Sequence, residues 1–307
     1  MNNYLLTLLG SSTDEFYELN HWPNEGEYAE SKDNGRKAGG PPLNMGCVVS
    51  SKGANVKCLD LLSDKADSSK FIVDTLNSYG IDTGYVEYGE AINCKIVIMN
   101  SNDKRTMFVT HPKRPFYKID ERKKELLNNA TYIYSMMHII NRSFENLEPL
   151  LEARKHGAKI LLDASSEFTL DWERNILFTL ADGVFVNKED YAHLVNNVDK
   201  DPKDILFENG CEFICITDGS NGSTLYTKDT CIKAETCKTE VVDSTGAGDS
   251  FAGGFVYGLL QDYSLDKCLR IASVSGSYAC TRLGGQGGCC SIEELYEYAN
   301  KKGYKID

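Results

Sequence analysis

The sequence contains no long apolar run, and basic residues are scarce in it. No stretch approaches the roughly 20 consecutive apolar residues of a membrane-spanning helix, and the first residues lack the basic segment of a signal peptide. The chain has 33 Lys and Arg residues against 45 Asp and Glu residues, so its formal net charge is −12. Nucleic acids and anionic membranes attract clusters of Lys and Arg, so we expect neither as a partner. These features favour a cytoplasmic enzyme that acts on a small molecule.

Zinc and disulfide patterns are also missing. The five histidines show neither the H-x-E nor the H-x₃-H spacing that would suggest a zinc site. The eleven cysteines are scattered, and the closest pair, Cys289-Cys290, is adjacent, which is a poor geometry for a disulfide or a metal knuckle. We therefore expect free thiols that pack as small apolar groups in a reducing compartment. No positive charge is expected near Cys289 and Cys290 to make them reactive.

Short apolar runs rich in Leu, Ile and Val alternate with longer helical patterns. Continuous apolar strands separated by helices indicate a mostly parallel sheet covered on both faces, which is the doubly wound α/β class. The composition, with 41% hydrophobic and 25% charged residues, is typical of a globular protein, and residues 1–307 are predicted to form a single domain. Ligands of such folds gather at the carboxyl ends of the strands. The expected strands are Tyr4–Leu9, Asn55–Leu61, Thr131–Tyr134, Lys159–Asp163, Gly183–Val186 and Phe213–Thr217.

Two early segments interrupt this alternation. One is the polar stretch Phe16–Lys37, and the other is the hairpin pattern of Lys95–Met99 and Thr106–Thr110 around the turn Asn102-Asp103-Lys104. We expect them to combine into a small β-sheet lid, built from residues of about 15–38 and 86–115, that could cover a substrate. A surface hairpin without a role is the alternative.

The most informative stretch runs from Val242 to Phe255, where a glycine-rich turn leads into a helix of small and apolar residues. Glycines let backbone N–H groups at a helix start approach a phosphate, and the helix dipole adds about half a positive charge there. The amides of Gly246, Ala247 and Gly248 are therefore candidates to hold a phosphate. Asp249 falls in the first helical turn, where it could accept the proton of a hydroxyl beside that phosphate. The pattern predicts phosphoryl transfer, and its alternative is an ordinary capped helix end.

Polar residues near the N-terminus are suited to bind hydroxyl groups. Asp14 follows the first expected strand, and one carboxylate can accept hydrogen bonds from two neighbouring hydroxyls. Gly39 and Gly40 precede a helical pattern that begins near Asn44, whose amide can both donate and accept. For Asp14 the alternative is a simple turn residue. Together the four residues are candidates to bind a polyol.

Two further groups of polar residues follow expected strands later in the chain. Asn187 and Asp190 come directly after Gly183–Val186, with Glu189 beside Asp190, and either acidic residue could instead cap the next helix. The run Thr217–Gly222 follows Phe213–Thr217 and is by itself a turn. Because parallel strands end at one edge of a sheet, these residues are expected near the ligand site.

These motifs resemble, in their order, those of the PfkB-type, ribokinase-like carbohydrate kinases, and the resemblance covers nearly the whole chain. The run Asp243–Asp249 is similar to the family phosphate loop D-T-x-G-A-G-D, with Ser244 in place of Thr. Gly39, Gly40 and Asn44 resemble the G-G-x-x-x-N signature. Pro41 stands where ribokinases proper carry Lys, which weakens a ribose assignment.

The resemblance implies ATP as the phosphate donor and Mg²⁺ as its companion. In relatives an N-x-x-E motif organises Mg²⁺ and its waters; here Asp190 stands at the Glu position and would hold the metal through water. Activation by a monovalent cation such as K⁺ stays open. The helical pattern Ala272–Leu283 and the glycine loop Gly284–Gly288 resemble the adenine side of the family site. The implied nucleotide-binding residues are Asn187, Thr217, Gly219, Gly222, Thr245, Gly246 and Gly248.

One family motif is incomplete. Many relatives carry D-x-N-x-R after the fourth strand, whereas this chain has Asp163-Ala164-Ser165-Ser166, so the Asn and Arg are missing. If that Arg normally holds a phosphate or substrate, a basic residue of the lid such as Arg105 could take its place.

The sequence therefore predicts an ATP-dependent phosphotransferase that phosphorylates a primary hydroxyl group of a small sugar or sugar derivative. Asp249 is the expected base, and Asp14, Gly39, Gly40 and Asn44 are expected to hold the sugar. A homodimer paired through the lid strands is plausible. A nucleoside kinase is one alternative, because aromatic residues lie in or near the lid segments. A sugar-binding relative without catalysis is another, although the intact Asp249 argues against it. Those aromatic residues are Phe16, Tyr17, Trp22 and Phe108.

Overall fold

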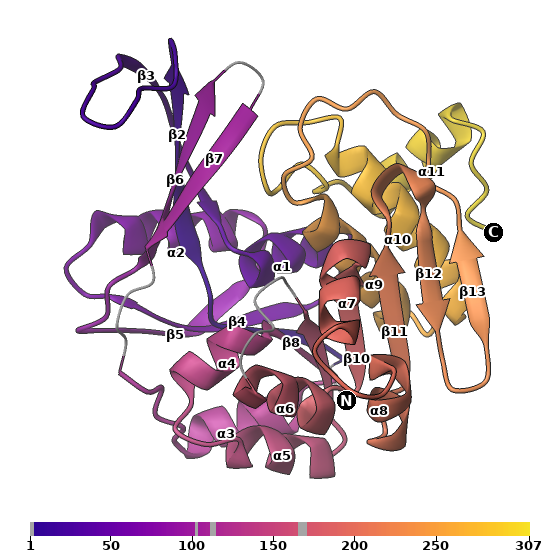
Figure 1. Cartoon of the computed structure of the whole chain (residues 1–307). Coiled ribbons are helices and arrows are strands. Elements are labelled where there is room, and N and C mark those ends of the chain that lie inside the picture. The colour runs from indigo at the N-terminus through magenta and orange to yellow at the C-terminus, as the bar shows by residue number, and fades with distance from the viewer. Residues whose placement is uncertain (1–2, 102–103, 111–114, 165–170) are drawn as a thin grey trace.

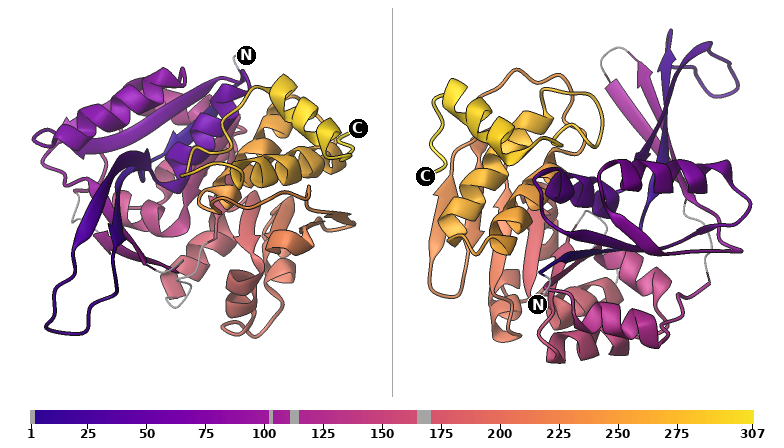
Figure 2. Two further views of the ribbon diagram at one scale, coloured as in Figure 1. Left: turned by 90° about the horizontal axis from the view of Figure 1, so that it is seen from above. Right: turned by 180° about the vertical axis from the view of Figure 1, so that it is seen from behind.

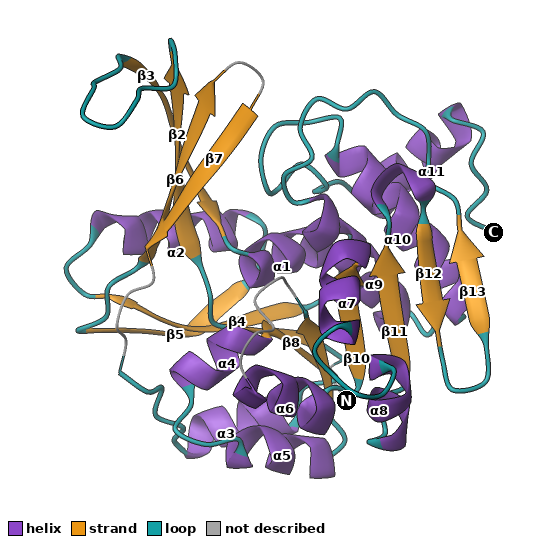
Figure 3. Ribbon diagram, in the orientation of Figure 1, coloured by secondary structure: helices purple, strands orange, loops and turns teal. Residues whose placement is uncertain are grey.

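A nine-stranded sheet forms the centre of the molecule in the computed structural model, which describes residues 3–101, 104–110, 115–164 and 171–307. Its strand order is β13-β12-β11-β10-β9-β8-β1-β4-β5, and all neighbouring strands run parallel except β12 and β13 at one edge. Figure 1 and Figure 3 show helices on both sides of this sheet. The strands are β1 (Leu5–Leu8), β4 (Val56–Ser63), β5 (Asp82–Gly89), β8 (Tyr132–Met136), β9 (Lys159–Asp163), β10 (Gly183–Asn187), β11 (Phe213–Thr217), β12 (Ser223–Tyr226) and β13 (Cys231–Ala234).

The two faces of the sheet belong to two separate apolar clusters. Successive side chains of a strand point to opposite faces, so Leu5 of β1 packs in one cluster while Leu6 packs in the other. The Leu5 face is covered by α1 (Pro41–Ser51), α2 (Asp67–Ser78), α9 (Ala247–Leu260) and α10 (Leu265–Ala279), with α11 (Ile292–Lys301) packed outside α10. The Leu6 face is covered by α3 (Glu121–Asn128), α4 (Met137–Ser143), α5 (Glu148–Lys155), α6 (Asp171–Leu180), α7 (Lys188–Val195) and α8 (Pro202–Glu208). The doubly wound α/β prediction is confirmed.

A second, four-stranded sheet projects from the main body (Figure 1, Figure 2). Its strand order is β3-β2-β6-β7, which joins two segments far apart in the sequence, as the interruptions of the alternation predicted. Residues 86–89 of the second expected segment fall in β5 instead, so the small sheet resumes only at Cys94. The turn residues Asn102 and Asp103, and residues 111–114, lie outside the described residues. The strands are β2 (Ser12–Leu19), β3 (Ser31–Gly39), β6 (Cys94–Ser101) and β7 (Lys104–Thr110).

Several element ends differ from the expected ones. β4 and β8 each extend two residues further than the expected strands Asn55–Leu61 and Thr131–Tyr134. The expected helix Ala272–Leu283 is α10, which starts seven residues earlier, where Ser264 accepts a hydrogen bond from the Lys267 N–H, and ends at Ala279. Asp14 lies within β2 rather than in a turn after β1, so it belongs to the base of the small sheet.

The cysteines are free thiols, as predicted. The expectation that Cys289 and Cys290 lack a nearby positive group is wrong, because the buried Lys52 places its Nζ 3.9 Å from the Cys290 Sγ. Burial nevertheless raises the pKa of both thiols, that of Cys289 to about 11, against the lowering effect of Lys52. No helix in the described ranges is both long and apolar enough to cross a membrane.

Candidate active site

The glycine-rich turn and the start of α9 form one corner of the site. Gly246 precedes the helix with φ = 73°, and a Cβ there would collide with the backbone of Gly285. This close approach requires glycine at 246. Gly248 lies in the first turn of the helix, where N–H groups have no intrahelical acceptor. The Ala247 N–H is already used, because it donates to the Ser244 carbonyl oxygen at 3.2 Å.

Asp243 ties this turn to the glycine loop after α10. Its Oδ1 accepts hydrogen bonds from the Thr245 N–H and hydroxyl, at 2.9 and 2.6 Å, and its Oδ2 accepts from the Gly284 N–H at 2.9 Å. Partial burial alone would raise the pKa of Asp243, but these hydrogen bonds hold it below its usual range. The carboxylate therefore acts as a fixed, charged brace between the two loops.

Asp249 lies beside Asn44 of α1, whose Nδ2 donates to the Asp249 Oδ2 at 2.7 Å. The residue is partly open to the cleft, while its carboxyl group is surrounded by protein. Burial raises the pKa of Asp249 to about 6, the charge of Asp14 adds to the rise, and the hydrogen bond from Asn44 opposes it. A carboxylate with such a pKa is well matched to accept a proton near neutral pH.

The expected sugar-binding residues lie together at the base of the small sheet. Asp14 is buried and accepts a hydrogen bond from the Ser12 hydroxyl at 2.9 Å. Gly39 lies so close to the Asp14 carboxyl that a side chain at 39 would displace it, and Gly40, with φ = 97°, approaches the Gly10 carbonyl in the same way. Burial raises the pKa of Asp14, while the Ser12 hydroxyl and the charge of Arg105 lower it.

The amide of Asn44 is engaged on both ends by protein atoms. Besides donating to Asp249, it accepts at Oδ1 a 2.5 Å hydrogen bond from the Gln286 Nε2, which also donates to the Ala38 carbonyl oxygen at 2.8 Å. Gln286 belongs to the loop Gly284–Gly288 that the sequence placed only on the adenine side. Its contact with Asn44 joins residues 242 apart and had no sequence signal other than its place in that loop.

Asp163 is a further acidic residue of the site, to which the sequence gave no role. It ends β9, and the Tyr134 hydroxyl donates to its Oδ2 at 3.1 Å. Burial raises the pKa of Asp163 to about 7, and the charges of Asp249 and Asp190 raise it as well. The signal available was its position at the carboxyl end of a central strand. Ser165 and Ser166, the next residues of that motif, lie outside the described residues.

Asn187 and Asp190 form a closed pair at the start of α7. The Asn187 side chain caps the helix by accepting from the Asp190 N–H at 2.8 Å, and its Nδ2 donates to the Asp190 Oδ2 at 2.5 Å. Among the described residues, no group of three or more His, Cys, Asp or Glu side chains is placed to hold a metal. Mg²⁺ commonly uses one or two carboxylates together with waters and substrate phosphates. Asp190, paired with Asn187 at the start of α7, fits that mode.

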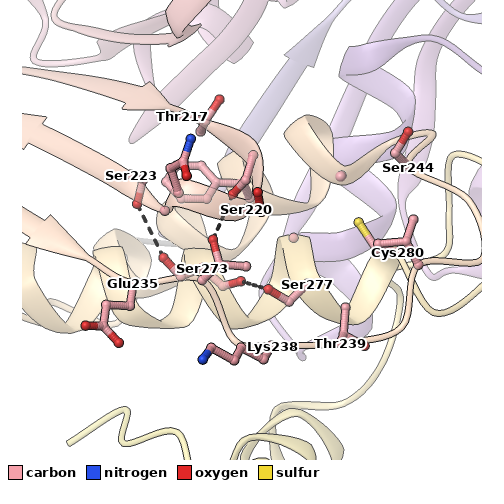
Figure 4. Close-up of a pocket in the computed structure, with 18 of the residues that line it drawn as sticks. Thr217, Ser220, Ser223, Glu235, Lys238, Thr239, Ser244, Ser273, Ser277 and Cys280 are labelled. Atoms are coloured by element: carbon pink, nitrogen blue, oxygen red, sulfur yellow. Dashed lines mark hydrogen bonds between the residues drawn. The ribbon is translucent and has the colours of Figure 1, made fainter.

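A cavity of about 830 Å³ opens beside the helix start (Figure 4). Of the expected nucleotide-binding residues, Thr217, Gly219, Gly222 and Gly248 line it, whereas Asn187, Thr245 and Gly246 do not. Ser273 and Ser277 of α10 form part of its wall; Ser273 contacts Ser223 at 3.3 Å, and the Ser277 hydroxyl donates to the Ser273 carbonyl oxygen at 2.9 Å. The sequence missed the loop between β13 and α9, which contributes Glu235, Thr236, Lys238, Thr239 and Val241.

Two basic residues connect the small sheet to these loops. Arg105 of β7 donates from Nη1 to the Thr245 hydroxyl and lies 3.7 Å from the Asp243 Oδ1. Lys37 of β3 donates from Nζ to the Leu283 carbonyl oxygen at 2.8 Å. The small sheet thus touches the phosphate loop on one side and the glycine loop on the other.

Comparisons with known proteins find one family and several relatives that cover most of the chain. The family model described as "pfkB family carbohydrate kinase" matches residues 5–291. The chain is 23% identical to the deoxyribokinase of Salmonella typhi over 308 residues, covering 95% of this chain and 98% of that protein. It is 24% identical to the probable fructokinase-3 of Arabidopsis thaliana, covering 80% and 78%.

Solved structures with the same fold cover almost all of the chain. The Arabidopsis thaliana ribokinase complexed with ribose and ATP matches with a TM-score of 0.84 at 20% identity, covering 97% of this chain and 99% of that one. The nucleoside kinase of Methanocaldococcus jannaschii matches with a TM-score of 0.78 at 18% identity, covering 98% and 99%.

Proposed function

Because the chain belongs to the pfkB family of carbohydrate kinases, we propose that it transfers the γ-phosphoryl group of ATP to a primary hydroxyl of a small sugar or sugar derivative. The observation that carries this proposal is the shared corner of Asp249 and the helix N-terminus. A carboxyl with a pKa of about 6 and the first-turn N–H of Gly248 lie between the base of the small sheet and the 830 Å³ cavity. That arrangement suits an acceptor hydroxyl on one side and a nucleotide on the other.

In the proposed reaction Asp249 accepts the proton of the hydroxyl as its oxygen attacks the γ-phosphorus. The N–H groups of Gly246 and Gly248 stabilise the charge that develops on the phosphate, while Ala247 contributes through the turn that its N–H closes. Asp14 accepts hydrogen bonds from sugar hydroxyls beside the bare backbone of Gly39 and Gly40. The remaining hydrogen and lone pair of the Asn44 amide can also face the sugar.

The nucleotide occupies the cavity beside α9 in this proposal. Thr217, Gly219 and Gly222 contact its phosphates and ribose, and the α10 wall lies next to the base. When bound, Mg²⁺ would neutralise charge between the β- and γ-phosphates, and Asn187 and Asp190 would hold it through water. Thr245 contributes by holding Arg105 at the phosphate loop.

Arg105 is proposed to replace the Arg that the D-x-N-x-R motif lacks here. Its guanidinium lies at the phosphate loop, and its charge lowers the pKa of Asp14. Arg105 therefore lies between the proposed phosphate site and the proposed sugar site. An Arg fork binds phosphate oxygens through paired hydrogen bonds. Arg105 belongs to the small sheet. Closure of this sheet as a lid would therefore exclude water and, in the same movement, bring the charge of Arg105 to the phosphoryl group that is transferred.

Two of the aromatic residues that kept a nucleoside acceptor open, Trp22 and Phe108, lie away from the site, whereas Phe16 shares a face of β2 with Asp14. Trp22 and Phe108 stack on each other, with ring centroids 6.4 Å apart, and about half of each side chain is exposed. Along β7, Phe108 points to the face opposite Arg105, because the two residues are three positions apart. Trp22 and Phe108 therefore give no support to a nucleoside, and Phe16 is the aromatic residue left to stack on a base. We also propose a cytoplasmic protein and a homodimer that pairs through the lid strands, to which the exposed stack of Trp22 and Phe108 would contribute.

The test is an ADP-release assay over a panel of sugars, sugar acids, amino sugars and nucleosides, with MgATP as donor. We expect turnover with a sugar or sugar derivative, and a loss of about 10²- to 10⁴-fold in kcat for Asp249→Asn with little change in nucleotide affinity. Asp229→Asn, in an exposed turn, is the matched control. No turnover with any acceptor would overturn the proposal, and turnover confined to nucleosides would favour a nucleoside kinase. Potassium and sodium buffers compared in parallel test monovalent activation.

A further inference from the structure

Gln286 sits where three parts of the site meet. Its Nε2 donates to the Ala38 carbonyl oxygen of β3 at 2.8 Å and to the Asn44 Oδ1 of α1 at 2.5 Å. Asn44 in turn donates to the Asp249 Oδ2 at 2.7 Å. A chain of hydrogen bonds therefore runs from a backbone carbonyl through two side-chain amides to the proposed base.

The Ala38 carbonyl oxygen determines which group donates and which accepts in each of these hydrogen bonds. A backbone carbonyl oxygen can only accept, so the Gln286 amide must turn its NH₂ group, not its oxygen, toward Ala38. The second hydrogen of that NH₂ group then points to Asn44, which must accept it with its Oδ1. The Asn44 Nδ2 is left facing Asp249 as a donor. With Gln286 absent, the Asn44 amide could turn over and present its oxygen to the carboxylate.

The loop that carries Gln286 is fixed against the same residues. A Cβ at Gly285 would collide with the Asn44 amide, and a Cβ at Gly288 would collide with the Ser250 hydroxyl of α9. Asn44 itself is 5% exposed. The Asn44 amide is therefore enclosed by protein, while Gln286 is half-buried in its loop.

We propose that Gln286 is a positioning residue for the base: by fixing the Asn44 amide, it ensures that Asn44 donates to Asp249 and holds that carboxyl in its ionised, proton-accepting form. The proposal rests on the assignment of Asp249 as the base of the kinase. It gives a role to a residue of the glycine loop that does not line the nucleotide cavity and that reaches the proposed sugar site through Asn44.

The charge balance around Asp249 shows why one donor matters. Asp14 of β2 and Asp163 of β9 both face it as acids, and the Tyr134 hydroxyl of β8 lies within the same set of interacting groups. Burial and the Asp14 charge both raise the pKa of Asp249, and the hydrogen bond from Asn44 is the lowering effect. Reversing that donor would move the pKa further up and leave the base protonated at neutral pH.

Gln286→Glu and Gln286→Met separate this role from a structural one. A carboxylate at 286 accepts from the Asn44 Nδ2, so it should reverse the Asn44 amide, whereas Met fills the same space without a preference. For Gln286→Glu we expect the acidic limb of the pH profile of kcat to move up by about one pH unit or more, with partial recovery of kcat at alkaline pH. For Gln286→Met we expect a smaller shift. An equal loss of kcat at every pH would mean a structural role and overturn the proposal.

A second readout needs no acceptor and keeps the two proposals separate. The difference in unfolding free energy between a protein and its Asp249→Asn variant, followed against pH, reports the pKa of Asp249 through linkage. We expect the midpoint of this difference to lie higher in the Gln286→Glu background than in the parent. In an Asn44→Ala background, Gln286→Met should not shift this midpoint, because Gln286 acts on Asp249 only through the Asn44 amide. An unmoved midpoint would overturn the inference even if the kinase assay succeeds, and a moved midpoint would support it even if no acceptor is turned over.

Discussion

Replacing Asp249 by Asn should lower kcat by about 10²- to 10⁴-fold and yet stabilise the protein at neutral pH. Burial raises the pKa of this carboxyl from 3.8 to about 6, which means that the folded protein binds its proton more tightly than the unfolded chain does. Well below its unfolded pKa of 3.8, the group is protonated in both states and contributes nothing. As the pH rises toward 6, the unfolded chain ionises first, and folding loses free energy. Above that range the loss is complete.

The size of this loss follows from the same values. A rise from 3.8 to about 6 corresponds to about 3 kcal/mol, at about 1.4 kcal/mol for each pKa unit. Asp249 is partly open to the cleft, so screening by solvent reduces the loss, and we expect about 1 to 3 kcal/mol. Asn keeps the size of the side chain and can still accept from the Asn44 Nδ2, so the substitution removes the charge and little else. For a protein of this length, the gain corresponds to a rise in Tm of about 2 to 6 °C.

Urea unfolding of the parent and of Asp249→Asn, at about pH 4 and at about pH 7, measures this effect. The variant should be more stable at the higher pH, and at about pH 4, close to the unfolded pKa of 3.8, the difference should shrink to about 0.5 kcal/mol or less. Asp229→Asn, which changes an exposed turn residue, should leave stability unchanged at both values. A variant that is no more stable than the parent at neutral pH, or equally more stable at both pH values, would refute the assignment of a buried, proton-binding carboxyl at this position.

Three further predictions concern the loops and the lid. Arg105→Lys keeps the charge but loses the paired hydrogen bonds, so we expect kcat to fall by at least about tenfold while the KM for the sugar changes less; a rise in KM alone would make Arg105 a sugar-binding residue. Gly246→Ala places a Cβ against Gly285 at a positive φ and should lower the free energy of unfolding by more than about 1 kcal/mol, measured by urea unfolding. Asp190→Asn should raise the Mg²⁺ concentration needed for half-maximal rate, and an unchanged requirement would remove Asp190 from the metal site.

The sequence predicted the fold well because its signals are local. The central strands of the parallel sheet are buried on both faces, so runs such as residues 213–216 are apolar and are visible without any partner, whereas the half-exposed edge strand β5 was not predicted. The ends were less certain, as α10 shows. This helix begins at Leu265, seven residues before its expected start at Ala272, because Ser264 caps it. Helix ends depend on such single contacts.

The candidate site was predictable where residues act through their own backbone or lie next to each other in sequence. Gly246, Gly248 and Asp249 occupy one turn and one helix start, so their spacing alone indicated an anion site with an acid beside it. The parts that were missed join distant segments. The Cys290–Lys52 contact and the loop Glu235–Val241 that lines the cavity were not visible in the chain order.

The order of apolar runs, turns and glycines thus determined by itself the α/β class and indicated the loop and the acid that we propose for phosphoryl transfer, because each depends on residues within a few positions of one another. Only the tertiary structure decided what surrounds Asp249. Asn44 of α1 donates to it, Asp14 of β2 acts on it by charge, and Gln286 contacts Asn44; the hydrogen bond from Asn44 and the charge of Asp14, together with burial, set its affinity for a proton. The proton affinity of a carboxyl group depends on its distance from other charged and polar groups and on the exclusion of water, and neither can be predicted from the order of the residues.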